Sequence, residues 1–179
     1  PITGNVARTL HRGIELSANM KIIDEISFYA NATYSRNEIK EGKYFLGGNK
    51  VIDLSGNRIS GFPDFLTNFG ISFNNDNLFL QLNGKYVGKF YSDNYDGNLS
   101  EYLAKYPGFV SYTDNINDAY FNADIMISYK IKLFNSLEPS KIFLQVNNLF
   151  DNLYSANAIG GEFFPAADRN FLAGVELGL

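Results

Sequence analysis

The chain has 179 residues, enough for one domain with a sizeable core, and it contains no Cys, no Trp and one His. These counts exclude a disulfide framework, a Cys-based zinc site and a thiol nucleophile. The 15 basic and 19 acidic residues give a formal net charge of −4, and Lys and Arg do not cluster as they do in nucleic-acid binders. No apolar run approaches the roughly 20 residues of a membrane-spanning helix. We therefore expect no nucleic-acid partner and no transmembrane helix.

Alternation of apolar and polar residues with a period of two dominates the chain and is typical of two-faced antiparallel strands. It is clearest over 119–133, where all eight odd positions are apolar and five of the seven even positions are polar. The predicted strands, in chain order, are 8–19, 25–36, 64–74, 77–91, 119–134, 141–150 and 168–179. No helix is predicted. The fold class is therefore all-β and antiparallel.

The connections between these strands alternate in length. In chain order they are short (20–24), long (37–63), a tight turn (74–77), long (92–118), short (135–140) and intermediate (151–167). Short periplasmic turns and long external loops are typical of an outer-membrane β-barrel, and bacterial single-chain barrels have an even number of strands. A seven-stranded sheet in lipid would leave unpaired backbone groups at its edges. We therefore expect an up-and-down transmembrane β-barrel fragment, with at least one further strand before Pro1.

Aromatic residues on the apolar faces lie towards the strand ends, and Ala, Ile, Leu and Val fill the middles. Such rims are typical of the two membrane interfaces. The predicted rim aromatics are Tyr34, Phe65 and Phe121 towards the outer ends and Phe28, Phe73 and Tyr129 towards the inner ends. This distribution predicts a location in the bacterial outer membrane, with lipid as a partner.

Four local patterns occur in order along the chain. They are Arg12-Gly13-Ile14-Glu15; Gly56-Asn57-Arg58 with Gly61-Phe62-Pro63; Asn148-Leu149-Phe150-Asp151-Asn152-Leu153-Tyr154; and Pro165 with Arg169-Asn170-Phe171. Their types and order resemble the C-terminal part of the barrel of a TonB-dependent outer-membrane receptor. The last strand also resembles the signal read by the barrel assembly machinery, with Gly174, Leu177 and Leu179 in place, although Leu172 and the terminal Leu depart from it.

The resemblance implies that residues 1–179 are the C-terminal segment of a large barrel of about 22 strands, with a plugged lumen. The plug domain, its contact with the TonB complex and the N-terminal strands would lie before Pro1. The implied function is TonB-energised uptake of a scarce ligand, such as an iron–siderophore complex, haem, cobalamin or a glycan. The resemblance implies no enzymatic activity and no cofactor.

The loop 91–118 is the best candidate for contact with a small-molecule or metal-chelate ligand, because aromatic rings with polar tips suit amphipathic ligands. Its candidate ligand-binding residues are Tyr91, Tyr95, Tyr102, Tyr106 and Tyr112. The alternative is that these side chains pack the loops on one another. An oxygen-rich run at Asp93, Asn94, Asp96 and Asn98 suits Ca²⁺ but lacks the bidentate Glu of an EF-hand, so we interpret it as a solvated turn and predict no metal site.

No catalytic constellation is recognisable, because one His and no Cys leave no nucleophile and base pair that we can place. His11 is expected to face the lumen as a polar side chain rather than as a haem ligand. Two alternatives stay open. One is a different outer-membrane barrel, such as a passive porin or an adhesive barrel. The other is a soluble β-sandwich carbohydrate-binding module, which would bury the odd-numbered face of 119–133 under a second sheet.

Overall fold

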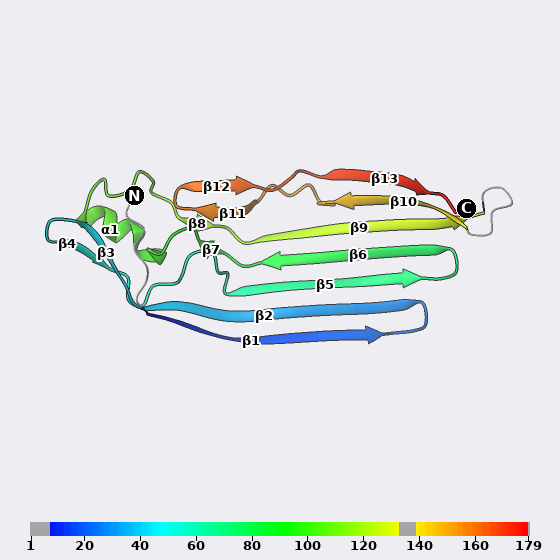
Figure 1. Ribbon diagram of the computed structural model, residues 1–179, viewed down its shortest axis with the longest axis horizontal. Coiled ribbons are helices and arrows are strands. Elements are labelled where there is room, and N and C mark those ends of the chain that lie inside the picture. The colour runs from blue at the N-terminus through cyan, green and yellow to red at the C-terminus, as the bar shows by residue number, and fades with distance from the viewer. Residues whose placement is uncertain (1–7, 133–138, 179) are drawn as a thin grey trace.

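The computed structural model describes residues 8–132 and 139–178, and it is built around one antiparallel sheet of seven long strands. These are β1 (Arg8–Lys21), β2 (Ile26–Glu41), β5 (Phe65–Asn74), β6 (Leu78–Val87), β9 (Tyr120–Ile131), β10 (Ser140–Asn147) and β13 (Asn170–Glu176). They lie side by side in chain order along the long axis of the molecule (Figure 1). The seven predicted strands are confirmed, although positions 133, 134 and 179, which were assigned to strand ends, lie outside the described residues.

The strands end where a neighbouring segment takes over the backbone hydrogen bonds. β2 continues to Glu41, beyond its predicted end at 36, because it stays paired with β1 up to Arg8. The first loop adds bonds there, since the backbone of Ile39 donates to Asn57 and that of Ile59 donates to Asn37. β6 stops at Val87 instead of 91. The short β7 (Phe90–Tyr91) that follows it pairs with β8 (Ile116–Asn117) instead of with β5.

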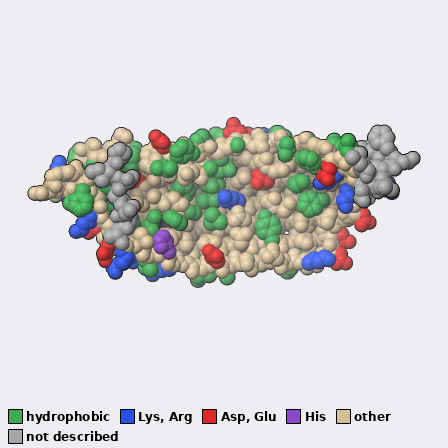
Figure 2. Space-filling model, viewed as in Figure 1, with side chains coloured by type: hydrophobic (Ala, Val, Ile, Leu, Met, Phe, Trp, Pro, Cys, Tyr) green, Lys and Arg blue, Asp and Glu red, His purple; other side chains and the backbone are tan. Residues whose placement is uncertain are grey.

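The register gives the sheet one apolar and one polar face, because residues paired across strands share a face. On the apolar face, Leu82 lies between Ile71 and Ile125. On the polar face, the Tyr29 hydroxyl donates to Asn83 Oδ1 over 3.0 Å. Figure 2 shows one side of the molecule, where charged side chains gather at the two ends and a few lie among neutral ones in between.

The apolar face is open in the described part of the chain. Ile127 and Tyr129 keep 38 % and 44 % of their surface exposed, and no second sheet packs over them. This is the face that a soluble β-sandwich would cover, so the structure counts against that alternative. No helix in the described residues is long and apolar enough to cross a membrane.

The predicted rim aromatics lie on this face near its two ends. Tyr34 pairs with Phe65 at one end of the sheet, and Phe121 lies beside Tyr86. Towards the other end lie Phe28, Phe73 and Tyr129, which pair with aliphatic residues of the neighbouring strands. Their role at a membrane interface stays a prediction.

A glycine on the polar face leaves room for the ring that covers it. The Phe143 ring of β10 lies over Gly174 of β13, its partner in the register. A Cβ atom at position 174 would stand 2.6 Å from Cζ of that ring, so the ring would have to shift to admit any other side chain. The ring therefore packs across the pair formed by the last two strands.

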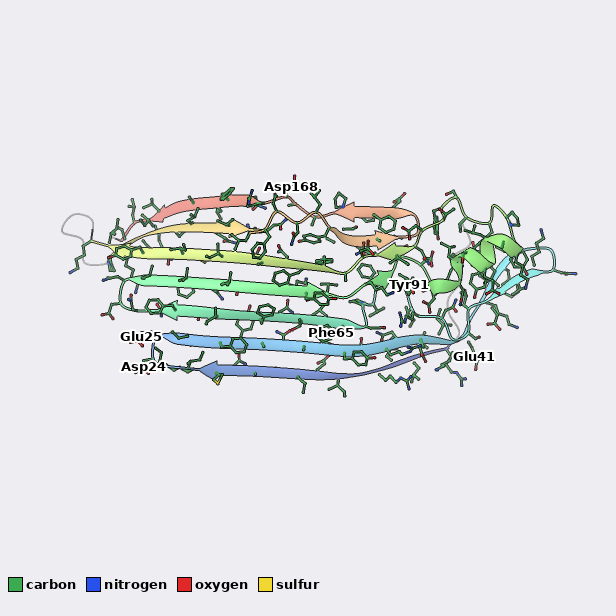
Figure 3. All side chains as sticks on the ribbon, turned by 180° about the vertical axis from the view of Figure 1, so that it is seen from behind. Asp24, Glu25, Glu41, Phe65, Tyr91 and Asp168 are labelled. Atoms are coloured by element: carbon green, nitrogen blue, oxygen red, sulfur yellow. The ribbon has the colours of Figure 1, made fainter. Side chains whose placement is uncertain are left out.

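The three long connections gather at one end of the sheet, and we call residues 42–63, 88–119 and 148–169 the loop body (Figure 1). Besides β7 and β8 it contains β3 (Lys43–Gly47), β4 (Lys50–Asp53), the 3₁₀ turn η1 (Asp96–Asn98), α1 (Leu99–Lys105), β11 (Ser155–Ile159) and β12 (Glu162–Pro165). The opposite end carries short turns. Figure 3 shows Asp24 and Glu25 at the turn that joins β1 to β2, and Glu41 at the far end of β2. The predicted alternation of connection lengths is confirmed for the described connections, whereas most of the predicted short connection at 135–140 lies outside the described residues.

The helix α1 corrects the expectation that the chain forms no helix. Residues 99–105 fold as a helix whose apolar residues Leu99, Tyr102 and Leu103 recur at spacings of three and four. That spacing puts them on one side, which packs on the rest of the loop body. A helix this short is marginal alone, so packing rather than propensity stabilises it.

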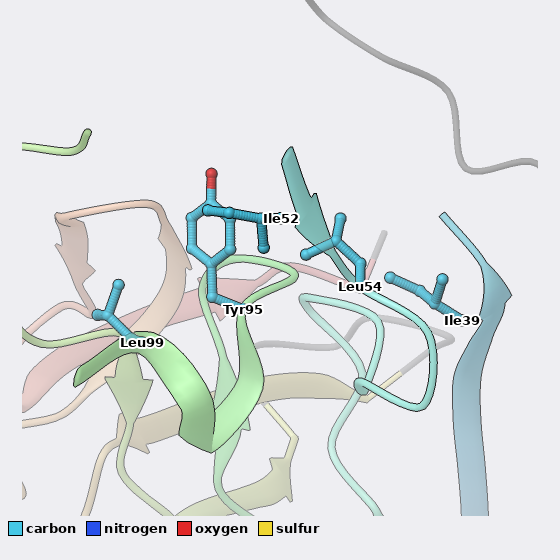
Figure 4. Close-up of a cluster of buried hydrophobic side chains, with 5 residues drawn as sticks. All are labelled: Ile39, Ile52, Leu54, Tyr95 and Leu99. Carbon is cyan, nitrogen blue, oxygen red and sulfur yellow. The ribbon is translucent and has the colours of Figure 1, made fainter. Parts of the chain in front are cut away.

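Most of the buried hydrophobic side chains belong to the loop body and the strand ends beside it. The larger cluster joins Ile39 of β2, Ile52 and Leu54 of the first loop, and Tyr95 and Leu99 of the second (Figure 4). A smaller cluster joins Val87, Phe90 and Ala158, which brings in the third loop. The core of the described chain therefore lies at the end of the sheet and not along its faces.

Candidate functional site in the loop body

Tyr95 lies at the centre of the contact between the first and the second loop. Its ring is 8 % exposed and meets the rings of Tyr44, Tyr102 and Phe109 edge-on, with centroids 6.1, 6.0 and 5.1 Å away. Edge-to-face arrangements of this kind are favourable beyond the area that they bury. Burial raises the pKa of the Tyr95 hydroxyl to about 12, so the ring stays neutral at any physiological pH.

The other predicted tyrosines also contribute to the packing of the loops. The Tyr102 hydroxyl donates to the Asp53 carbonyl over 3.1 Å, and the Tyr106 hydroxyl donates to the Val51 carbonyl over 3.3 Å. Tyr112 donates to Asp93 Oδ2 over 3.0 Å, and burial raises the pKa of its hydroxyl. Tyr91 is buried, and its ring lies 5.9 Å from the guanidinium carbon of Arg58. Contact of these five residues with a ligand stays a prediction.

The oxygen-rich run holds the loops together by hydrogen bonds. Asp93 Oδ1 accepts from the Tyr95 backbone and from Asn115 Nδ2, each over 2.8 Å. Asn94 Oδ1 accepts from the Ser60 backbone over 2.9 Å, and Asp96 Oδ2 accepts from the Arg58 backbone over 3.1 Å. Burial, opposed in part by these hydrogen bonds, raises the pKa of Asp93. The described residues contain no cluster of three or more acidic, His or Cys side chains that could hold a metal.

The third loop is tied to the second through Ser92, which is buried. The Gly160 backbone donates to the Ser92 carbonyl over 2.9 Å, and the Ser92 hydroxyl donates back to the Gly160 carbonyl. Nearby, Asn117 Nδ2 donates to the Ser155 carbonyl over 3.0 Å. These hydrogen bonds join the third loop to the second, and the second is joined to the first through Asp96 and Tyr102.

A cavity of about 580 Å³ opens between the second and third loops. Among its lining residues are the rings of Tyr120 and Tyr154, which stack with centroids 4.2 Å apart, and the carboxylates of Asp114 and Asp118. Burial raises the pKa of the Tyr154 hydroxyl. A second groove of about 420 Å³ lies at the tips of the first two loops; Lys50 and Lys105 line it, and Lys105 Nζ lies 5.3 Å from the centre of the Tyr106 ring. These hollows have the size and the mixed polarity of small-ligand sites.

Sequence reasoning named Tyr154 only as a motif residue and did not place either hollow. The residues of the first hollow come from 114–121 and 152–163, and those of the second from 44–50 and 105–109. The spacing along the chain gives no sign that these segments meet. The only usable signal was the density of Tyr and Asp in the loops.

The Asn148–Tyr154 motif is a structural clamp between the last strands. Asn148 and Asp151 both have positive φ angles, 52° and 57°, a conformation that Asn and Asp tolerate better than most residues. Asn148 is buried, accepts from the Asn152 backbone over 3.0 Å and donates to the carbonyls of Asn152 and Ala167. Asp151 accepts from the Arg169 backbone over 2.9 Å, and its second oxygen lies 3.6 Å from the Arg169 guanidinium. The third and fourth sequence patterns therefore act as one unit.

The remaining motif residues are placed along this clamp or on the first strand. Leu149 donates its backbone N–H to the Ala123 carbonyl over 2.7 Å, whereas the side chains of Phe150 and Phe171 are largely exposed. Gly61 has a φ of 79° and donates to the Tyr91 carbonyl, and Pro63 follows it just before β5.

On β1, Gly13 lies so close to β2 that a Cβ atom would stand 2.6 Å from the Tyr34 carbonyl oxygen. His11 Nδ1 is 2.8 Å from Asn37 Oδ1, and Glu15 pairs with Thr33 on the same face. Arg12 points to the opposite, apolar face. The lone histidine is therefore engaged with a polar neighbour, in agreement with its interpretation as a structural residue.

The TonB-dependent receptor-like β-barrel family model matches residues 1–149. Among solved structures, the siderophore receptor PiuA from Acinetobacter baumannii is similar with 21 % identity and a TM-score of 0.72, over 93 % of this chain and 21 % of that one. The ferric-catecholate import receptor Fiu from E. coli K12 has 20 % identity and a TM-score of 0.67, over 96 % and 21 %. The ferric citrate transporter FecA has 18 % identity and a TM-score of 0.70, over 94 % and 24 %.

The chain thus spans about a fifth to a quarter of the length of these three structures. Identities this low indicate a shared fold. No curated protein matches the sequence.

Proposed function

Because the chain belongs to the TonB-dependent receptor-like β-barrel family, we propose that it forms part of the wall and the outer loops of a bacterial outer-membrane receptor. The observation that carries the proposal is the sheet, which has an open apolar face and gathers all three long loops at one end. In lipid that face is solvated by hydrocarbon, and the loops lie outside the cell. The family and the structural neighbours are transport receptors and not enzymes.

We propose that residues 1–179 are a C-terminal segment of the barrel and that the plug domain and further strands belong to the same receptor. β1 and β13 each pair with one strand in the described residues, which leaves two edges for further strands. The plug region would engage the TonB complex, and the strand around Gly174 would engage the barrel assembly machinery. A passive porin or an adhesive barrel is disfavoured by the family match.

The proposed ligand is a small molecule or metal chelate bound at the loop body. PiuA and Fiu are described as siderophore and ferric-catecholate receptors, which supports an iron chelate as the first class to test. Within the loop body, we propose that Tyr102, Tyr106 and Tyr112 present partly exposed rings to the ligand. Tyr91 and Tyr95 are buried and would act by holding the loops in place.

The first experiment is fractionation of source-cell membranes, followed by a blot for this segment. The proposal predicts a band several times larger than the 20.1 kDa of this chain in the outer-membrane fraction. A species of about 20 kDa in the soluble fraction would contradict it and would favour the β-sandwich alternative.

A second experiment tests the ligand class with cells that do or do not express the receptor. The probes are ⁵⁵Fe complexes of a catecholate chelator, of a hydroxamate chelator and of citrate. The proposal predicts receptor-dependent uptake of at least one complex, and Tyr106→Ala should weaken it more than Tyr106→Phe. Equal uptake by both cell types for all three probes would exclude these iron chelates as ligands.

A further inference from the structure

Four cations stand close together at the loop end of β1 and β2, and we call them the basic cluster. They are Arg8, Arg12, Arg36 and Lys40. Arg8 forms a 2.7 Å ion pair with Glu41. The other three surround one carboxylate, that of Glu38, which lies 2.7 Å from Lys40 Nζ and 3.9 Å from the Arg12 guanidinium and is hydrogen-bonded to Arg36 Nε.

The basic cluster lies on the same side of the sheet as the apolar side chains, just beyond the last of them at the loop end. Arg12 pairs with Arg36 across the two strands, and Ile14 pairs with Tyr34 two residues nearer the middle of the sheet. Since side chains alternate along a strand, these four residues share one face. The cluster therefore begins where the apolar band ends, on the side of the loop body.

The charges of the cluster are unbalanced at its surface. The Glu38 side chain is only 9 % exposed, whereas those of Arg12, Arg36 and Lys40 are 63 %, 42 % and 38 % exposed. Arg12 and Arg36 lie directly opposite each other on neighbouring strands and repel. The single buried carboxylate of Glu38 is the counter-ion of three cations. The arrangement leaves exposed guanidinium groups without a protein partner of opposite charge beyond Glu38 in the described residues. A planar guanidinium is well suited to a phosphate in this setting.

We propose that the basic cluster binds phosphate groups of lipids in the outer leaflet. The height of the cluster on the sheet selects a lipid rather than a soluble phosphate, because it adjoins the apolar band that acyl chains would cover. Arginine close to the interface is tolerated there, and basic groups at this depth attract anionic headgroups. The inference rests on the proposed outer-membrane location.

The test uses the intact receptor, freed of lipid in non-ionic detergent, and native mass spectrometry with two probes. These are lipid A that carries both of its phosphates and the same lipid after its phosphates have been removed. We expect Arg12→Gln/Arg36→Gln to weaken binding of the phosphorylated lipid by about tenfold or more and to leave the dephosphorylated lipid unaffected. Arg12→Lys/Arg36→Lys should restore most of the binding, and millimolar inorganic phosphate should not compete.

The matched control is Lys21→Gln/Lys141→Gln, which removes two cations from ion pairs with Asp24 and Glu176 at the turn end of the sheet. It should bind both lipids as the unchanged receptor does. The Arg12→Gln single variant separates loss of binding from misfolding. The Arg12 side chain is largely exposed and its contact with Glu38 is long, so we expect this variant to fold normally.

Unchanged binding of phosphorylated lipid by folded Arg12→Gln/Arg36→Gln would overturn the proposal, as would an equal loss in the control. Competition by inorganic phosphate would assign the site to a soluble anion instead. A receptor that binds neither lipid and forms no barrel resistant to cold detergent would contradict the proposed function itself.

Discussion

The sheet and the loop body are stabilised in different ways. The loop body has a small core like that of a water-soluble protein, in which Tyr95, Ile52 and Leu99 form one buried cluster that reaches Ile39 at the end of β2. The sheet has regular strand pairing but leaves Ile71, Leu82 and their neighbours exposed on a continuous apolar face. The difference teaches that the loop body buries its apolar side chains against one another, whereas the described residues leave those of the sheet uncovered, as the proposed contact with lipid requires.

The largest expected effect separates these two regions within one molecule. Replacing Tyr95 with Ala removes a buried ring from the centre of the loop body, where truncation of a large aromatic costs about 3–5 kcal/mol. We expect amide exchange over residues 92–118 to accelerate strongly, while exchange in β5, β6 and β9 is unchanged. Tyr95→Phe is the control, because it keeps the ring. Equal acceleration in the sheet would show that the two regions unfold together.

A charge in the apolar band tests the other region. Leu82→Arg places a cation in the middle of β6 on the apolar face and should destabilise the receptor in vesicles by about 2–4 kcal/mol, as measured by urea unfolding. Gln81→Arg is the matched control, because position 81 lies on the polar face of the same strand. If the two variants were equally stable, the apolar face would not be the lipid-facing one.

The clamp between β10 and β13 gives an intermediate effect. Asn148→Ala removes a buried side chain and its part-buried hydrogen bond with the Asn152 backbone N–H, and should cost about 1–3 kcal/mol. The measurement is the rate of unfolding of the intact receptor. It is followed on detergent gels of unheated samples, in which the folded barrel and the unfolded chain migrate differently. Asn147→Ala, one residue earlier, is the control, because its side chain bonds only the side chains of Asn170 and Gln145 and no backbone group of the clamp. Equal unfolding rates for the two variants would show that the motif does not hold the last strands.

The smallest expected effect is a pH dependence confined to the loop body. Burial raises the pKa of Asp93 in the folded loop above its unfolded value, and the charge of Asp96 raises it further. The folded loop therefore holds this proton more tightly. The resulting stabilisation is complete below the ordinary Asp pKa of about 3.9 and is lost as pH rises through the raised value.

Amide protection of residues 92–118, corrected for intrinsic exchange, should thus fall over this range, and Asp93→Asn should abolish the trend. Asp114→Asn, at an exposed position of the same loop, is the control. An unchanged trend in Asp93→Asn would assign the titration to another group.

The sequence predicts the sheet well because its signal is local. Alternation over 119–133 is sufficient to give β9 its strand and its apolar face, and the connection lengths place the loops at one end. The ends of β2 and β6 were misplaced because segments distant in the chain, at Arg8 and around Ile116, decide where pairing continues.

The loop body was predicted poorly because its contacts join segments far apart in the chain. The helix at 99–105 was missed for a different reason. Leu99, Tyr102 and Leu103 do have helical spacing, but a seven-residue signal is weak in a chain whose dominant pattern is that of strands. The tyrosines of 91–118 were identified as candidates, yet nothing in their spacing shows that the hydroxyl groups of Tyr102 and Tyr106 donate to the backbone of the first loop. Likewise, the partners of Ser92 could not be inferred from its neighbours.

The most direct test of the account is the environment of alternate residues on β9. This segment contains no Cys, so single Cys variants at Ile125, Met126, Ile127 and Ser128 of the receptor in vesicles can each carry one fluorophore. We predict that a quencher dissolved in the acyl chains dims the label at 125 and 127, and that an aqueous quencher dims it at 126 and 128. Quenching only from the aqueous phase at all four positions would contradict a sheet that lies in the membrane with its apolar face towards lipid.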